Sequence, residues 1–155
     1  MSTLERFRTL RDAASPSTDD LDALWADLAP VRAADLLGHW RGGDFATGHV
    51  ISTVLEKSRW HGKWFDGLLE VTPIVCRDED DKFVANTKAA GGGGASLWDL
   101  EFRGEVTATM VYDRLPVFDH FKAVDDGLLM GIMNGKLQAT YGITDLYYFW
   151  LERDA

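Results

Sequence analysis

The spacing of the apolar positions changes near Lys63, from a helical period to strict alternation. In the part before Lys63, a helix is predicted to begin at Ser17 or Thr18, both good N-cap residues, and to end at Pro30. We expect its apolar face to pack on the body of the protein. That face is formed by Leu21, Leu24, Trp25 and Leu28.

Two other segments of the first part are candidate helices. Residues 3–14 are short and charged, and form either a helix or an arm. Residues 47–59 carry an apolar stripe at helical spacing, with Thr47 as the expected cap and His49 in the first turn. The stripe consists of Val50, Ile51, Val54 and Leu55.

After Lys63, apolar and polar residues alternate as in half-buried strands. Strands are predicted over residues 97–103, 105–112, 117–124, 128–133 and 145–153. Asp126-Gly127 and Asn134-Gly135 are strong hairpin signals, because both dipeptides tolerate a positive φ, and Arg103-Gly104 is a weaker one. Strands joined by such tight turns are antiparallel.

The sequence therefore predicts a mainly β (α+β) fold in a single domain over residues 1–155. Residues 1–65 form a helical front, and residues 66–155 form about seven or eight strands that close as a small antiparallel meander barrel. A flat sheet with this many aromatic residues would leave an apolar face exposed to water. The Gly91–Gly94 tract lacks the Lys-Ser/Thr of a phosphate loop and is read as a loop between strands.

Charge and cysteine content narrow the class of partner and compartment. The net charge of −9 would repel phosphate backbones, so nucleic acid is not expected as a partner. Cys76 is the single cysteine, which excludes an internal disulfide and fits a reducing cytoplasm, where we place the protein. No apolar run reaches the ~20 residues of a membrane-spanning helix, so no integral membrane segment is predicted.

Residues 36–65 concentrate chemistry-bearing side chains, with three of the six Trp and three of the four His. They contain Gly38-x-Trp40-x-Gly42, Thr47-Gly48-His49 and Trp60-x-Gly62-Lys63, and this pattern resembles the GXWXG family of small bacterial proteins. The second half resembles the family's companion domain of unknown function. Its matching pieces are Phe102-Arg103-Gly104, Tyr112-Asp113-x-x-Pro116, Asp119-x-Phe121, Asp125-Asp126, Gly131-x-Met133, Lys136 and Tyr148-Phe149-x-Leu151-x-Arg153.

The resemblance has one departure and one wider implication. The family pattern implies an acidic residue after Met133, where this chain has Asn134. The Gly-x-Trp segment is also similar to that of the lipocalin and fatty-acid-binding group. That likeness implies a lipocalin-like barrel in which Trp40 closes one end beneath Arg153, through a stacked guanidinium.

We expect the barrel to bind a small hydrophobic or amphipathic ligand, lipid or fatty-acid-like, in its interior. Asp119 lies on an apolar face and therefore needs a basic partner or a functional role. His49 and Lys63 would hold a carboxylate or phosphate head group. Met130, Phe149 and Trp150 would add apolar surface. The full set of candidate ligand-binding residues is Trp40, His49, Trp60, Lys63, Trp64, Met110, Tyr112, Asp119, Phe121 and Met133.

Two other functions remain open at this point. The first is an acid–base enzyme of the isomerase or cyclase type, using His49, Asp113 or Asp119, or His120 with Asp119. The second is an interaction module whose barrel is solid core. No cofactor is predicted, and no metal, because the histidines lack the spacing of ligand sets. The pattern leaves the oligomeric state open, a homodimer included.

Overall fold

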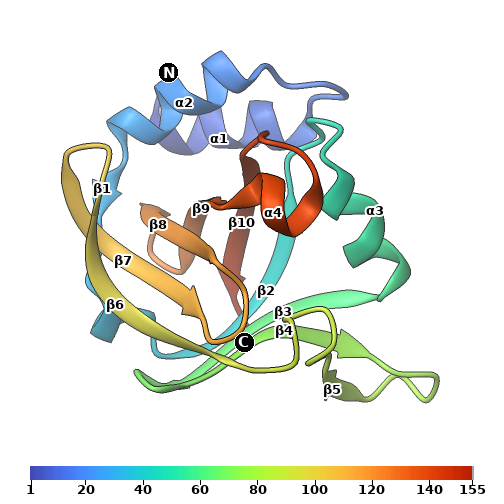
Figure 1. Cartoon of the computed structure of the whole chain (residues 1–155). Helices are drawn as coiled ribbons and strands as arrows, with labels where there is room; N and C mark the ends of the chain where they lie inside the picture. Colours follow the sequence, from blue (N-terminus) through green and yellow to red (C-terminus); the bar gives the residue numbers. More distant parts are fainter. Residues whose placement is uncertain (155) are drawn as a thin grey trace.

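The structure is a computed structural model that describes residues 1–154 as a barrel of strands with helices across one side (Figure 1). The helices are α1 (Thr3–Asp12), α2 (Thr18–Asp27), α3 (Val50–Lys57) and α4 (Leu137–Tyr141), with a short 3-10 helix η1 (Ala33–Leu36). The strands are β1 (Ala29–Pro30), β2 (Gly38–Asp44), β3 (Trp60–Gly67), β4 (Glu70–Arg77), β5 (Phe83–Ala85), β6 (Ala95–Phe102), β7 (Glu105–Tyr112), β8 (Val117–Asp125), β9 (Leu128–Gly135) and β10 (Tyr147–Arg153).

Among residues 1–154, eight strands close into a ring. The order around the ring is β2, β3, β4, β6, β7, β8, β9 and β10, every pairing is antiparallel, and β10 returns to pair with β2. β1 pairs with β8, and β5 pairs with the edge of β4. The predicted antiparallel meander barrel is therefore confirmed, and its closure removes the open edges that a flat sheet would leave.

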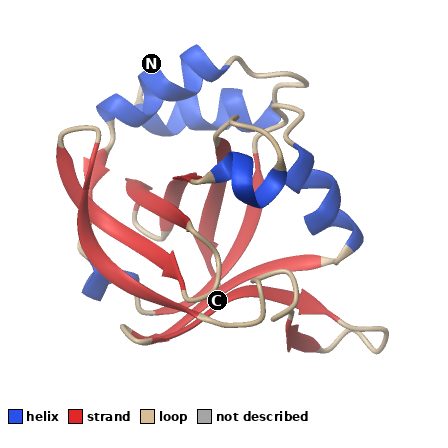
Figure 2. Ribbon diagram, in the orientation of Figure 1, coloured by secondary structure: helices blue, strands red, loops and turns tan. Residues whose placement is uncertain are grey.

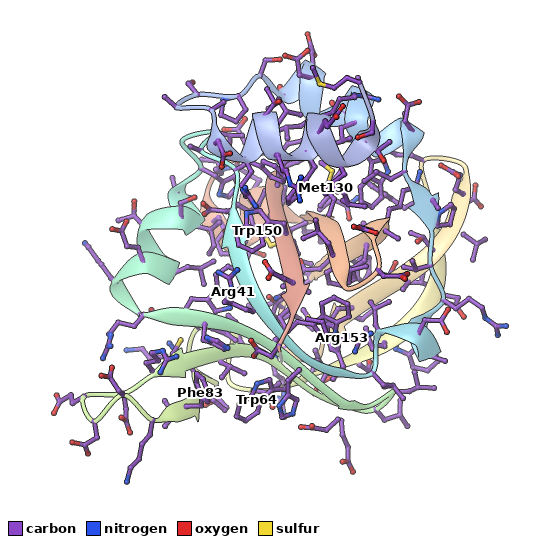
Figure 3. All side chains as sticks on the ribbon, turned by 180° about the vertical axis from the view of Figure 1, so that it is seen from behind. Arg41, Trp64, Phe83, Met130, Trp150 and Arg153 are labelled. Carbon is purple, nitrogen blue, oxygen red and sulfur yellow. The ribbon has the colours of Figure 1, made fainter. Side chains whose placement is uncertain are left out.

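Alternation along the strands creates two separate apolar cores. In β10, Phe149 and Leu151 point into the barrel, whereas Tyr148 and Trp150 point outward and are covered by the helical layer. Met130 of β9 also packs in that outer core. The sequence analysis expected Met130 and Trp150 to add apolar surface to the barrel interior. This expectation is wrong, because both side chains point outward from their strands into the outer core (Figure 3).

The helices α1 and α2 cover the outer core, and a serine N-cap fixes where each of them begins. Ser2 forms a capping box with Glu5, and the Ser17 hydroxyl accepts a hydrogen bond from the backbone N–H of Asp20 at 3.0 Å. Residues 3–12 of the predicted helix or arm thus form a helix, and Ser17 is the N-cap of α2. The four helices α1 to α4 lie on one side of the strands, whereas the short helix η1 lies elsewhere (Figure 2).

The GXWXG segment is a barrel strand, and its residues explain how the end near η1 is closed. Trp40 is buried, its indole N–H donates to the Leu36 carbonyl at 2.8 Å, and the Arg153 guanidinium lies 4.2 Å from the centre of its ring. The predicted stacking of Arg153 on Trp40 is therefore present. Arg153 also donates to the carbonyls of Leu37 and Asp35, which fixes η1 across this end.

Two glycines allow neighbouring strands to approach closely at the motif. A Cβ atom at Gly42 would overlap the ring of Trp60, and one at Gly62 would overlap the backbone carbonyl of Trp40. The Trp60 ring of β3 can therefore approach β2 this closely only because position 42 has no side chain. Gly62 permits the close pairing of β2 with β3 for the same reason.

The structure differs from the sequence prediction in three places. Residues 38–44 and 60–67 are strands of the ring, so the first sixty-five residues are not only a helical front. Asn134-Gly135 ends β9 and leads into α4, and does not form a hairpin turn. The cap of α3 is His49, whose ring accepts the Ile51 N–H, and not Thr47.

We predict that Gly62→Ala lowers the free energy of unfolding by about 3 kcal/mol or more, because the new methyl group meets a backbone atom that cannot rotate away. Gly67→Ala in the same strand is the matched control, since its Cβ would make an ordinary contact at 3.6 Å with Glu70. Urea denaturation of both variants measures the difference. Equal stabilities for the two variants would contradict this account of the motif.

Candidate functional site

A small cavity lies inside the barrel beneath α3 and α4. Its volume is about 20 Å³, and apolar and aromatic side chains line most of it. α3 contributes Ile51 and Leu55, α4 contributes Tyr141, and strands on all sides of the ring supply the rest. The strand residues are Trp60, Lys63, Ile74, Tyr112, Asp119, Met133, Tyr147 and Phe149.

An ion pair crosses this cavity between opposite walls of the barrel. Lys63 is on β3 and Asp119 is on β8, and three strands separate β3 from β8 in either direction around the ring. The Lys63 Nζ lies 3.1 Å from the Asp119 Oδ2, and the two residues are only 4% and 2% exposed. The sequence requirement that Asp119 find a basic partner is met, by a residue from the far wall.

Lys63 is held by more than its partner carboxylate. Its Nζ donates to the Pro73 carbonyl at 3.0 Å and lies 5.4–5.8 Å from the ring centres of Trp60, Tyr112 and Phe149. These contacts compensate the ammonium for the loss of water, since aromatic faces attract cations. The charge of Lys63 is therefore well satisfied by the protein itself.

Asp119 is satisfied on one side only. Its Oδ1 atom is buried and accepts no hydrogen bond among residues 1–154, although the Tyr112 hydroxyl lies near enough to the Asp119 carboxylate for their interaction to raise the pKa of Tyr112. A buried carboxylate oxygen without a donor is costly, by roughly 1–3 kcal/mol or more. The unmatched oxygen therefore marks the place in the cavity where a donor would bind most favourably.

Three tyrosines surround the charged pair with protonated hydroxyl groups. Burial, followed by the negative charge of Asp119, raises the pKa of Tyr112 well above its usual value and raises the pKa of Tyr141 to about 12. The pKa of Tyr147 is raised well above its usual value by burial and by Asp44, whose carboxylate accepts its hydroxyl at 2.8 Å. At neutral pH these phenols are hydrogen-bond donors.

Five of the ten residues proposed from the sequence line this cavity: Trp60, Lys63, Tyr112, Asp119 and Met133. Trp40, Met110 and Phe121 are buried in the same core but do not border the cavity. Met110 is the cross-strand partner of Asp119 on β7, so it supports the wall from the side. The barrel thus unites half of the predicted set.

His49 and Trp64 lie elsewhere. His49 caps α3 through Nδ1, and its Nε2 lies 2.9 Å from the Asp145 carbonyl, so both nitrogens are used by backbone groups. Trp64 faces outward and stacks on His39, with ring centres 4.4 Å apart, next to Phe83. In Figure 3, Trp64 and Phe83 lie at the end of the molecule away from the helical layer.

Five cavity residues had no ligand-binding role proposed from the sequence: Ile51, Leu55, Ile74, Tyr141 and Tyr147. Phe149, which was expected to add apolar surface, also lines the cavity. Ile51 and Leu55 belong to the predicted apolar stripe of α3, and that stripe was the available signal. Tyr147 and Phe149 are two residues apart in the predicted last strand and therefore share one of its faces. Tyr141 gave no signal, because α4 is only five residues long and was not predicted.

The candidate acid–base groups are mostly remote from the cavity. Asp119 and His120 are adjacent on β8 and therefore point to opposite faces. The His120 ring stacks on Phe102 at 3.9 Å, and its nitrogens contact Thr109 and Asn134. Asn134, which departs from the family pattern, thus holds His120. Asp113 lies in the exposed turn between β7 and β8, so of these groups Asp119 alone borders the cavity.

The fold and the site together define a small meander barrel with a buried ion pair beneath a helical cover. The family described as "GXWXG protein" matches residues 23–81, and "Domain of unknown function (DUF4334)" matches residues 93–153. A solved structure titled "Crystal structure of protein from Thermomonospora curvata" is 32% identical, with 100% of each chain covered and a TM-score of 0.87. No curated protein matches. The chain belongs to the GXWXG family, with the DUF4334 domain as its second part.

Among residues 1–154, no helix has the length and apolar character needed to cross a membrane. Within the same residues, no group of three or more His, Cys, Asp or Glu side chains is placed to hold a metal ion. Cys76 is buried in the core, and burial raises the pKa of its thiol.

We predict that the folded protein shows no tyrosine ionisation near pH 10. The pKa of each of the four tyrosines is raised, to about 12 for Tyr141 and Tyr148, so the folded state binds protons that the unfolded state releases. The tyrosines therefore do not change the stability below about pH 10, and the stability that they contribute is lost as the pH rises toward 12. Absorbance at the tyrosinate band, with and without denaturant, measures this. A native transition near pH 10 would contradict it.

We predict that Lys63→Met and Asp119→Leu each destabilise the fold by about 3–5 kcal/mol, because each leaves one buried charge without its partner. The double variant should be more stable than the sum of the two losses predicts. Glu152→Gln, in the exposed pair with Arg41, is the control and should cost less than about 1 kcal/mol. Additive losses in a double-mutant cycle would show that the two charges do not interact.

Proposed function

We propose that the protein binds a small, mainly apolar molecule with one polar group, held in the barrel cavity beneath α3 and α4. The observation that carries the proposal is the Asp119 Oδ1 atom, which is buried at the cavity and lacks a hydrogen-bond partner among the described residues. An apolar cavity with a few convergent polar groups is the usual form of a small-molecule site. Lipocalins, which are barrels with the same number of strands, hold small ligands in this way.

The size of the cavity determines how a ligand would be accommodated. A volume of about 20 Å³ holds a group of about the size of one water molecule, whereas established ligand sites occupy roughly 300–1,000 Å³. The polar group of the ligand would take the existing space beside Asp119. To make room for its apolar body, the side chains that α3 and α4 place over the cavity would have to move outward.

A surface cleft indicates where that movement would open a path. The cleft has a volume of about 280 Å³ and lies between α3 and β2. It shares Leu55 and Trp60 with the cavity, so these two side chains form the partition between them. The cleft also contains Asp44, which accepts hydrogen bonds from the Ser52 hydroxyl of α3 and the Tyr147 hydroxyl of β10. Release of these bonds would let α3 move away from the barrel.

A second candidate function is acid–base chemistry on the same molecule, of the isomerase or cyclase type. It is favoured by the position of Asp119, a buried carboxylate with one free oxygen beside protonated phenols. A base and an acid close together within an apolar cavity is an arrangement suited to proton transfer. Asp119 would be the base, and Tyr112 or Tyr141 the acid.

We predict that Met133→Phe weakens binding by at least about tenfold, because the larger ring fills the space next to Asp119. Met130→Phe is the matched control, since Met130 is equally buried on the same strand but faces the helical layer. Calorimetric titration with small cycloalkanes, each with one hydroxyl, ketone or carboxylate group, measures affinity. Absence of binding by every compound, together with only apoprotein in native mass spectrometry, would overturn the proposed function.

A further inference from the structure

The charge of Lys63 is already balanced inside the barrel. Its ammonium contacts the Asp119 Oδ2 and the Pro73 carbonyl, and aromatic rings surround the remaining direction. An ammonium has three protons and no acceptor site, so few of its interactions remain for a ligand. Lys63 is therefore not a free receptor for an anionic head group.

The unmatched oxygen of Asp119 selects against anions and against pure acceptors. An ionised carboxylate accepts hydrogen bonds and donates none. A ligand carboxylate beside Oδ1 would bring two negative charges together in a buried site, where repulsion is strong. A ketone would place a second acceptor against the first. A hydroxyl group supplies the missing donor and carries no charge.

The remaining requirement of such a hydroxyl is also met at the cavity. Its oxygen can accept a hydrogen bond, and Tyr112 and Tyr141 both border the same space. Burial and the charge of Asp119 raise the pKa of both phenols, so they stay protonated and can donate. A hydroxyl between Asp119 and a phenol would thus have both a donor and an acceptor partner.

We propose that the ligand is a neutral alcohol or phenol whose hydroxyl donates to the Asp119 Oδ1, and not a fatty acid or other anion. This inference rests on the proposed function and specifies its ligand class. It departs from the sequence-based expectation that His49 and Lys63 hold a carboxylate or phosphate. His49 is used by backbone groups, and Lys63 is neutralised by Asp119.

The test compares three probes of similar size on the wild-type protein: cyclohexanol, cyclohexanone and cyclohexanecarboxylate. We expect cyclohexanol to bind at least about tenfold more tightly than either of the others, since only it gives Oδ1 a donor. Equal or tighter binding of the ketone or the carboxylate overturns the ligand class and leaves the proposed function intact. Absence of binding by all three overturns the ligand class, and it overturns the proposed function as well when native mass spectrometry shows only apoprotein.

Asp119→Asn tests the direction of the hydrogen bond. Because Lys63 can only donate, the amide oxygen stays on the Lys63 side and the NH₂ group takes the place of Oδ1. The preference for cyclohexanol should then be lost, because the NH₂ group donates equally well to a hydroxyl oxygen and to a ketone oxygen. Asp125→Asn, in an exposed position at the end of the same strand, should retain the wild-type preference.

One result for the Asp119→Asn variant would contradict the proposal. A folded Asp119→Asn protein that still prefers cyclohexanol would show that Oδ1 does not receive the ligand hydroxyl. Circular dichroism establishes folding before titration. If the variant fails to fold, the order of the three probes on the wild-type protein decides the proposal by itself.

Discussion

Closure of the ring by the pairing of β10 with β2 is the constraint on which the rest of the structure depends. The register of this pairing sets Arg153 opposite Trp40 and Trp150 opposite Gly43. The first contact closes one end of the barrel, and the second lets a large ring lie over a strand without a side chain in its way. Without closure, the strands that carry Lys63 and Asp119 would not face each other, and the cavity would not exist.

The ion pair across the barrel is an expensive way to join two walls. Burying two charges costs several kcal/mol each, and a packed apolar pair of similar volume is often at least as stable. The protein reduces this cost for Lys63 through a carbonyl and three aromatic rings, yet one oxygen of Asp119 is left without a donor among the described residues. Such asymmetry is easier to explain by a ligand than by stability alone.

Local sequence rules explain much of the fold. The cap at Ser17, the alternation in residues 105–112 and the turn at Asp126-Gly127 each depend on neighbours within a few residues, and each was predicted correctly. The strand at residues 38–44 was not predicted, because glycines interrupt the alternation and their role is to admit rings from other strands. The Asn134-Gly135 signal failed because β9 has already found both neighbours and continues into α4.

The sequence by itself determined that the chain forms a meander barrel, that Asp119 needs a partner, and that Trp40 and Arg153 belong together by resemblance. Only the tertiary structure decided that the partner is Lys63, that Tyr141 and Tyr147 join the site, and that His49 and Trp64 do not. The physical reason is the range of the interactions. Periodicity fixes which face a residue takes, but the curvature and register of a closed ring fix which faces meet.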